Sequence, residues 1–349
     1  MRASRTKVHE VKRCGPGSSL EEHTIVTLDD IREARTRLDG ITVRTPLIPL
    51  EWNGDKLYLK PENLQPIGAF KLRGAYNKIA SLTDEERLRG VITYSSGNHA
   101  QGVAYAARAL ATKAVIVMPR NAPAIKREAT AALGAEVVLV GPSGVERQEK
   151  AEELAAQHGY VIIPPYDDDK IIAGQGTAGL EILEDFPEVD LVLVPIGGGG
   201  LISGISTAIK TVRPDAKVIG VEPELAADAQ ASFRAGEIVK FPVEQVLSTS
   251  ADGLRSQYVG TLTFEHIRRY VDDVVTVSEE DIFNAVRILA ENPKTTAEPS
   301  GAVAPAAWLF HRDSLPASNA TVAVISGGNL DPELLKKALS PDRSALSAR

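Results

Sequence analysis

From residue 27 onward the chain alternates short apolar runs with amphipathic stretches, and this alternation constrains the fold more than any other feature. Strands are predicted at 56–60, 90–98, 113–119, 135–140, 160–164, 189–196, 216–223 and 320–329. Helices are predicted at 27–38, 72–82, 99–110, 122–133, 144–159 and 177–186. Strands that alternate with helices form parallel sheets whose two faces are both covered. The sequence therefore predicts an α/β fold with two doubly wound open-sheet domains.

The order of these segments also predicts the domain organisation. We expect a disordered basic leader over residues 1–24, a small domain over 83–166, and a large domain formed by 25–82 together with 167–345. The leader, which begins "MRASRTKVHEVKRCGPGSS", lacks the apolar core of a secretory signal. Because about twenty residues follow "ISGGN", we expect no additional C-terminal regulatory domain.

Composition excludes several classes of partner. The 349 residues carry a formal net charge of −7, which argues against nucleic acid or an anionic membrane as the main partner. No apolar run approaches the roughly 18–20 residues that span a bilayer. The single cysteine, Cys14, excludes an internal disulfide framework and lies in the leader. We expect a cytoplasmic protein.

A run of four glycines follows one of the buried strands. The stretch "PIGGGGLISG" (195–204) places these glycines between the strand and the next helix. Backbone amides that lack a nearby Cβ can approach an anion closely, and the helix adds partial positive charge at its first turn. No Gly-Lys-Ser/Thr follows, and lysine and arginine stand where a dinucleotide site needs an acidic residue. The run therefore predicts a phosphate site of another kind.

A lysine with open space around it is a candidate for binding a cofactor. In "GAFKLRGAYNKI" (68–79), Lys71 follows Phe70 between small residues. Two further predicted strands end in small polar residues, at "SSGNH" (95–99) and "ISGGN" (325–329). Ligands of open α/β sheets bind at the carboxyl ends of strands. A reactive amine beside a phosphate site is what pyridoxal phosphate (PLP) requires, because it binds proteins through a Schiff base and an anion site.

Seven stretches together resemble the fold-type II PLP enzymes, in the threonine/serine dehydratase and serine racemase family. The resemblance extends over about residues 27–335 and implies a tryptophan synthase β-like fold. The matching stretches are "KPENLQPIGAFKLRGAYNKI" (60–79), "SSGNHAQGVAYAA" (95–107), "PPYDDDKIIAGQGTAGLEI" (164–182), "PIGGGGLISG" (195–204), "ADGL" (251–254), "EPSGA" (298–302) and "SGGN" (326–329). Ala69 departs from the serine that is frequent before Phe-Lys in this family.

The resemblance implies a role for individual residues. Lys71 resembles the Schiff-base lysine, Asn98 the partner of the cofactor's 3-hydroxyl, and Ser326 the partner of its pyridine nitrogen. The implied cofactor-binding residues are Lys71, Phe70, Asn98, Gly197, Gly198, Gly199, Gly200, Leu201, Glu298 and Ser326. The implied substrate-binding residues are Ser95, Ser96, Gly97, Asn98, His99 and Arg147. Arg147 would approach a second carboxylate of the substrate, and its alternative is a solvated helix face.

An acidic turn, "VEPELAAD" (221–228), is a candidate metal site. Glu222, the Ala226 carbonyl and Asp228, completed by waters, suit octahedral Mg²⁺ or Ca²⁺. Metal-activated members of the family have a similar spacing. The alternative is a solvated acidic loop.

These observations predict an ammonia-lyase that converts L-threonine and L-serine to 2-oxobutanoate and pyruvate, with a homodimer as the family expectation. Many threonine dehydratases have alanine at the position of Ser96. A serine there serves as the second acid/base in the serine racemase branch, so Ser96 is a second candidate catalytic residue beside Lys71. The alternative is that Ser96 only lines the site of the substrate's carboxylate. Serine racemase, 3-hydroxyaspartate dehydratase and a dehydratase of hydroxyectoine breakdown are the alternatives. A binding protein that has lost catalysis is the alternative from another class, and Lys71 weighs against it.

Overall fold

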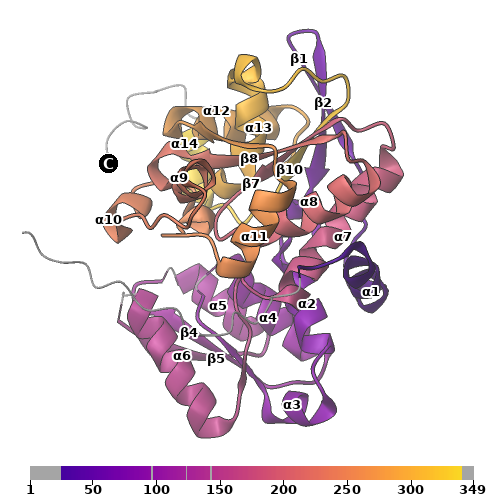
Figure 1. Ribbon diagram of the computed structural model, residues 1–349. Helices are drawn as coiled ribbons and strands as arrows, with labels where there is room; N and C mark the ends of the chain where they lie inside the picture. Colours follow the sequence, from indigo (N-terminus) through magenta and orange to yellow (C-terminus); the bar gives the residue numbers. More distant parts are fainter. Residues whose placement is uncertain (1–24, 96, 123, 142–143, 340–349) are drawn as a thin grey trace, which may run out of the picture.

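The computed structural model describes residues 25–95, 97–122, 124–141 and 144–339 (Figure 1). The predicted leader, with Cys14, and the candidate Ser96 lie outside the described residues. Among the residues that are described, no helix combines the length and the apolar character needed to cross a membrane.

Six strands form the larger of two sheets. Their order is β1-β2-β10-β7-β8-β9. The strands are β1 (Ile48–Trp52), β2 (Asp55–Pro61), β7 (Leu191–Pro195), β8 (Lys217–Pro223), β9 (Asp273–Val277) and β10 (Thr321–Ile325). All neighbours pair in parallel except β1 and β2, which form an antiparallel hairpin closed by a two-residue turn at Asn53 and Gly54. The predicted α/β class is confirmed, with one antiparallel strand added at the edge.

Four strands form the smaller sheet, in the order β5-β4-β3-β6. These strands are β3 (Val91–Thr93), β4 (Ala114–Pro119), β5 (Glu136–Val140) and β6 (Val161–Ile162). All of them pair in parallel. They fall within the range 83–166 that is predicted as the small domain, although the boundary itself stays a prediction.

Helices join these strands. The α-helices are α1 (Leu28–Leu38), α2 (Lys71–Ala80), α3 (Asp84–Arg89), α4 (Asn98–Ala109), α5 (Ala124–Ala132), α6 (Gly144–His158), α7 (Asp169–Asp185), α8 (Gly200–Val212), α9 (Asp228–Ala235), α10 (Val243–Val246), α11 (Thr261–Tyr270), α12 (Glu279–Glu291), α13 (Pro299–Phe310) and α14 (Pro332–Leu339). Short 3₁₀ helices are η1 (Glu62–Leu64), η2 (Glu224–Ala226), η3 (Asp252–Leu254) and η4 (Arg312–Ser314).

The strands of the large sheet are buried on both faces. Leu191 and Leu193 of β7 belong to an apolar cluster with α12 and α13, whereas Val192 and Val194 belong to another with α7, α8 and α11. Side chains of a strand alternate between the two faces, so a doubly covered strand must be apolar throughout. This burial explains why the sequence of β7 shows no alternation.

Helix α2 lies between the two sheets, where it packs against both α4 and α7 (Figure 1). Its residues Leu72, Ala75 and Ile79 are fully buried in the cluster that contains the small sheet. The first residue of α2 is Lys71. The candidate lysine therefore stands where the two sheets approach each other.

Candidate active site

The segment before Lys71 pairs with the segment that follows β10. The Phe70 amide donates to the Ser326 carbonyl at 3.0 Å, and the Gly328 amide donates to the Gly68 carbonyl at 2.9 Å. Between these bonds, Ala69 and Gly327 form an antiparallel bridge. Two motifs far apart in the sequence, "GAFK" and "SGGN", are thus joined by backbone hydrogen bonds. This pairing places the amine-bearing residue at the carboxyl end of β10.

The Lys71 amine is directed into the protein. Its Nζ donates to the Pro165 carbonyl at 2.6 Å and lies 5.2 Å from the centre of the Phe70 ring. Burial lowers the pKa of Lys71 from its ordinary value to about 8, because the charged form loses its hydration. A substantial fraction of the amine is therefore neutral and nucleophilic near physiological pH.

The glycine run forms a cradle at the end of β7. Gly199 has φ +95° and precedes α8, so no side chain caps the first amides of that helix. Thr263 Oγ1 donates to the Gly198 carbonyl at 2.7 Å and holds the loop from α11. A Cβ on Gly198 would lie 2.2 Å from the ring of Tyr166. The loop therefore needs glycine for close approach, and its free amides at a helix N-terminus fit a phosphate group.

The residues expected around the cofactor ring come together at the same edge. Asn98, the first residue of α4, donates from Nδ2 to Oε1 of Glu298 at 2.5 Å. Ser326 is buried and its Oγ donates to the Ser300 carbonyl at 3.3 Å. Asn329, to which the sequence reasoning assigned no role, donates to Asn98 Oδ1 at 2.7 Å. The only signal for Asn329 was its place in "SGGN".

Helix α4 offers uncapped amides beside Lys71. Its N-cap is Gly97, which has no side chain, and the Gly97 amide donates weakly to Ser95 Oγ at 3.4 Å. His99 is buried, with Nε2 at 3.0 Å from the Ile163 carbonyl. Burial, with a smaller effect of Lys71, lowers the pKa of His99 to about 3. His99 is therefore a neutral imidazole at neutral pH, and its Nε2–H donates to the Ile163 carbonyl and supports the loop.

Arg147 lies at the start of α6, just beyond the carboxyl end of β5. This end of the small sheet is also the one that carries Ser95 and Asn98, since the strands are parallel. Its Nε is buried and has no hydrogen-bond partner among the described residues. Burial lowers the pKa of Arg147 from its ordinary value. A buried guanidinium nitrogen that has no partner among the described residues suits an anion from outside them.

The candidate metal ligands contain an unsatisfied carboxylate. Both oxygens of Asp228 are buried and have no hydrogen-bond partner among the described residues. Glu222 is also buried and accepts from the Ala229 amide at 3.0 Å and the Gln230 amide at 2.7 Å. Burial raises the pKa of Asp228 to about 8, and burial together with Asp228 raises that of Glu222.

These two side chains would not hold a metal ion by themselves. In the described part of the chain, no group of three or more His, Cys, Asp or Glu residues lies close enough together to do so. Ala226, whose carbonyl is the third candidate ligand, is buried at the end of η2 between the two acidic residues in sequence. Two buried carboxylates that lack a cation in contact suit a hard divalent ion, since such an ion would offset their desolvation.

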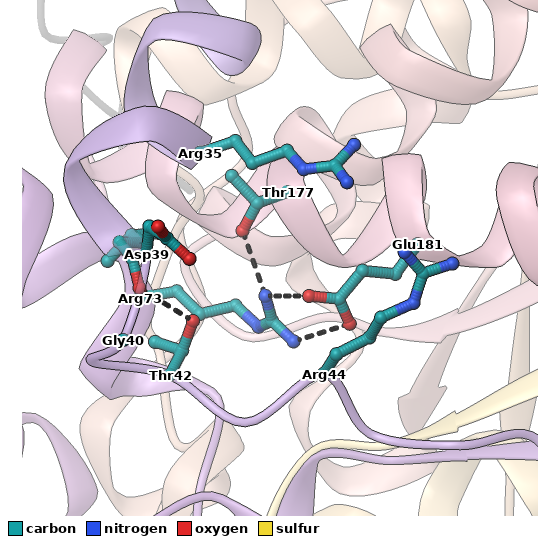
Figure 2. A pocket seen from close by; sticks show the side chains of 9 residues that line it. Arg35, Asp39, Gly40, Thr42, Arg44, Arg73, Thr177 and Glu181 are labelled. Carbon is teal, nitrogen blue, oxygen red and sulfur yellow. Dashed lines mark hydrogen bonds and ion pairs between the residues drawn. The ribbon is translucent and has the colours of Figure 1, made fainter.

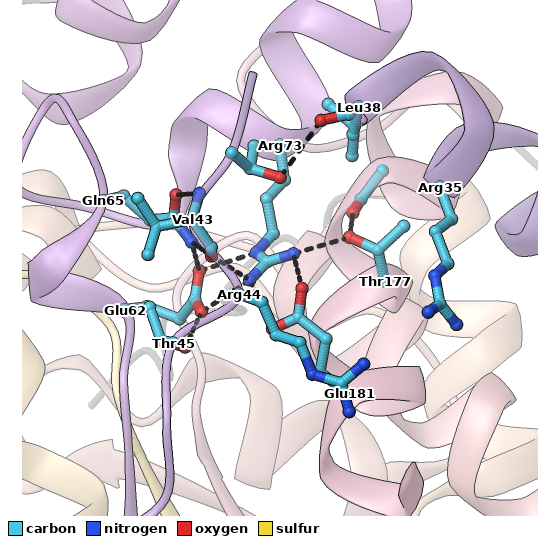
Figure 3. A network of polar contacts seen from close by, with 12 residues as sticks. Arg35, Leu38, Val43, Arg44, Thr45, Glu62, Gln65, Arg73, Thr177 and Glu181 are labelled. Atoms are coloured by element: carbon cyan, nitrogen blue, oxygen red, sulfur yellow. Dashed lines mark hydrogen bonds and ion pairs between the residues drawn. The ribbon is translucent and has the colours of Figure 1, made fainter. Parts of the chain in front are cut away.

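A buried ionic network, to which the sequence reasoning assigned no role, begins two residues after Lys71. Arg73 donates to both oxygens of Glu62, at 2.7 and 2.8 Å, and to both oxygens of Glu181, at 2.7 and 2.8 Å. Lys60 donates to Glu181 at 2.6 Å and to the Thr45 carbonyl at 2.7 Å. Figure 3 shows the Arg73 guanidinium between the two carboxylates. Two cations and two anions thus neutralise one another and fasten α2 to α7.

A cavity of about 150 Å³ opens beside this network (Figure 2). Its lining includes Arg35, Arg44, Arg73, Thr177 and Glu181. Arg35 and Arg44 both form ion pairs with Glu184. Because the cations of this cavity already have partners, the cavity does not compete with the Lys71 site as the place of catalysis.

Comparison with known proteins agrees with this geometry. The family described as "Pyridoxal-phosphate dependent enzyme" matches residues 38–327. The chain is 47% identical over 321 residues to an L-threonine ammonia-lyase of Thermotoga maritima, covering 90% of this chain and 79% of the relative. It is 41% identical to an L-threo-3-hydroxyaspartate ammonia-lyase of Saccharomyces cerevisiae, covering 88% and 94%.

A solved structure shares the fold over most of the chain. Serine racemase from Dictyostelium discoideum superposes with a TM-score of 0.82 at 40% identity, covering 88% of this chain and 99% of that one. The resemblance found in the sequence is thereby confirmed. The chain belongs to the family of pyridoxal-phosphate dependent enzymes.

Proposed function

We propose that this chain is a PLP-dependent ammonia-lyase that converts L-threonine and L-serine to 2-oxobutanoate and pyruvate with release of ammonia. The observation that carries the proposal is the inward-facing Lys71 amine, which has a pKa of about 8 and lies at the strand edge that also carries the glycine cradle. The identity of 47% to a relative named L-threonine ammonia-lyase supports the substrate class.

The residues present fit the cofactor. Lys71 would bind its aldehyde, the amides of the glycine loop and Leu201 its phosphate, and Asn98 its 3-oxygen. Phe70 would pack beside the ring, with Glu298 near it and Ser326 at the ring nitrogen. The uncapped start of α8 supports the phosphate assignment, and the inward direction of Lys71 supports the covalent one.

Bound PLP supplies an electron sink for the negative charge that develops at the substrate Cα. Lys71 acts as the base that takes the Cα proton at Nζ, and a pKa of about 8 leaves enough neutral amine for this step. Ser326 carries no charge and has one hydroxyl hydrogen, which points to the Ser300 carbonyl at 3.3 Å and, turned to the ring nitrogen, would offer it a neutral hydrogen bond. A neutral partner disfavours full delocalisation of the charge, and this favours loss of the β-hydroxyl over transamination.

The start of α4 is the proposed site of the substrate's α-carboxylate. An anion placed there would meet the first-turn amides, which Gly97 cannot cap, and the partial positive charge of the helix. Ser95 adds a hydroxyl at the same loop. We also assign Ser96 to this carboxylate site. His99 supports the loop through its contact with the Ile163 carbonyl.

The second candidate is a 3-hydroxyaspartate ammonia-lyase. The specific observation is the buried Nε of Arg147, which has no partner in the described part of the chain and lies at the carboxyl edge of the small sheet. A relative with that printed name is 41% identical. An arginine that binds a β-carboxylate in two parallel hydrogen bonds would prefer hydroxyaspartate over threonine.

The metal and the assembly belong to the same proposal. Mg²⁺ or Ca²⁺ at Glu222, the Ala226 carbonyl and Asp228 is supported by the buried oxygens of Asp228, for which the described residues provide no hydrogen-bond partner. A homodimer and a cytoplasmic location are expected from the family resemblance and the single cysteine.

A substrate panel tests the proposal. PLP-loaded protein is incubated with L-threonine, L-serine and L-threo-3-hydroxyaspartate, with chelator or with Mg²⁺, and 2-oxo acid is measured as its hydrazone. Chiral chromatography of the serine reaction measures D-serine. We expect 2-oxobutanoate and pyruvate, and no product from Lys71→Ala. D-serine that accumulates faster than pyruvate would establish racemisation as the main activity, and turnover of hydroxyaspartate alone would favour the second candidate.

A further inference from the structure

Three side chains form a directed chain of hydrogen bonds across the candidate active site. Asn329 Nδ2 donates to the Ile67 carbonyl at 2.9 Å and to Asn98 Oδ1 at 2.7 Å. Asn98 Nδ2 then donates to Glu298 Oε1 at 2.5 Å. Asn98 begins α4, on the side of the small sheet, whereas Glu298 and Asn329 belong to the side of the large sheet.

The direction of this chain is determined at both ends. The carbonyl of Ile67 can only accept, so Asn329 must turn its NH₂ group toward it. The second hydrogen of that NH₂ group meets Asn98, which must therefore present Oδ1. The carboxylate of Glu298 also only accepts, so it receives Nδ2 of Asn98. Side-chain amides can be turned either way in principle, and here the network selects one orientation.

The backbone around Gly68 keeps Asn329 in place. Gly68 has φ +73°, and a Cβ there would lie 2.4 Å from Asn329 Oδ1. The Gly68 carbonyl accepts from the Gly328 amide, immediately before Asn329. Asn329 is thus packed against the segment that leads to Lys71, with both of its amide hydrogens donated.

We propose that Asn329 is a positioning residue that fixes the amide of Asn98, so that its NH₂ group and not its oxygen faces the 3-oxygen of the cofactor. This inference rests on the proposed function, in which Asn98 contacts PLP. One hydrogen of Asn98 Nδ2 goes to Glu298, and the other has no partner among the described residues. A donated hydrogen bond stabilises an ionised 3-oxygen, whereas Oδ1 in the same place would favour a protonated 3-hydroxyl.

The test compares two variants with a matched control. Asn329→Asp replaces the donor by an acceptor that repels Asn98 Oδ1, and the turned amide that relieves this repulsion brings Oδ1 against Glu298. Asn329→Ala removes the donor and with it the bonds to both Asn98 and the Ile67 carbonyl. Asn63→Asp is the control, because Asn63 Nδ2 also donates twice, to Thr295 Oγ1 at 2.9 Å and the Thr296 carbonyl at 2.8 Å, in a contact that does not include Asn98. Each cofactor-free protein is titrated with PLP, and the absorption bands of the bound cofactor are recorded.

We expect Kd for PLP to rise about 10-fold in Asn329→Ala, because the hydrogen bond that orients Asn98 is lost together with the one to the Ile67 carbonyl. In Asn329→Asp we expect a rise of about 100-fold and a larger share of the short-wavelength absorption band, the sign of a protonated 3-hydroxyl. Asn63→Asp should stay within about threefold and keep the wild-type ratio of bands. Thermal unfolding of each cofactor-free variant establishes that it folds. If Asn329→Asp does not fold, the PLP affinity of Asn329→Ala decides the test.

Two results would overturn the inference: equal loss of affinity in Asn329→Ala and Asn63→Asp, or an unchanged band ratio in a folded Asn329→Asp protein. Asn98→Ala separates this failure from that of the proposed site. If Asn98→Ala binds PLP as wild type does, Asn98 does not contact the cofactor and the inference fails with that assignment. If Asn98→Ala weakens PLP binding and the Asn329 variants do not, only the role of Asn329 is wrong.

Discussion

Replacing Arg73 by methionine should lower the free energy of unfolding by several kcal/mol. Arg73 itself would not touch cofactor or substrate. Its side chain is 1% exposed and neutralises Glu62 and Glu181. Without it, Glu181 keeps Lys60 at 2.6 Å, whereas Glu62 keeps only neutral donors, Thr45 Oγ1 at 2.8 Å and Gln65 Nε2 at 3.1 Å. An uncompensated buried charge costs about 3–5 kcal/mol. We expect the loss to come mainly from Glu62.

The assay is urea unfolding at pH 7, followed by circular dichroism. With an m-value of about 3 kcal/mol/M, the midpoint should fall by roughly 1–1.7 M. The control is Arg32→Met, which removes an ion pair with Asp29 whose side chains are 61% and 88% exposed, and which should cost less than about 1 kcal/mol. The double variant Arg73→Met/Glu62→Gln should recover most of the loss, because it removes the stranded charge.

The stability that Arg73→Met loses relative to the wild type should become smaller as the pH falls. In the wild type, burial opposes ionisation of Glu62, but Arg73, with smaller effects of Lys60 and Thr45, outweighs it and lowers the pKa of Glu62, so this stability is present above the unfolded pKa and is lost as pH falls. In Arg73→Met the pKa of Glu62 would instead be raised, so its penalty would disappear as the carboxyl is protonated. The deficit should therefore shrink between pH 7 and pH 5. A midpoint shift no larger than that of Arg32→Met, or a deficit that grows on acidification, would refute the reasoning.

Four further predictions follow from the site. Lys71→Ala should fold but neither retain PLP through dialysis nor form 2-oxo acid, and measurable turnover would contradict its role. The rate at which cofactor-free protein takes up PLP should rise with pH through about 8, since only the neutral Lys71 amine attacks, and a flat profile from pH 7 to 9 would contradict this. Mg²⁺ or Ca²⁺ should raise the melting temperature of wild type but not of Asp228→Asn, and equal effects in both would exclude Asp228 as a ligand. Gly198→Ala should weaken PLP binding at least about 10-fold, because its Cβ would collide with Tyr166, and unchanged affinity would show that the loop yields.

The sequence by itself determined the fold class and the set of candidate cofactor residues. Apolar runs without alternation predict strands covered on both faces, and β7 has this property because Leu191 and Val192 lie in cores on opposite faces. The hairpin of β1 and β2 was missed, although the dipeptide Asn53-Gly54 is a known signal for a two-residue turn. Local signals of this kind can be read because they depend on neighbours in the chain.

Only the tertiary structure decided which groups face one another. Lys71 meets the carbonyl of Pro165, 94 residues away, and Asn329 meets Asn98 across 231 residues. Arg73 lies between Glu62 and Glu181, although charged residues in a helix are usually solvated. Neither residue type nor spacing specifies such contacts, because a hydrogen bond depends on distances and directions that the packing of α2, α4 and α7 establishes.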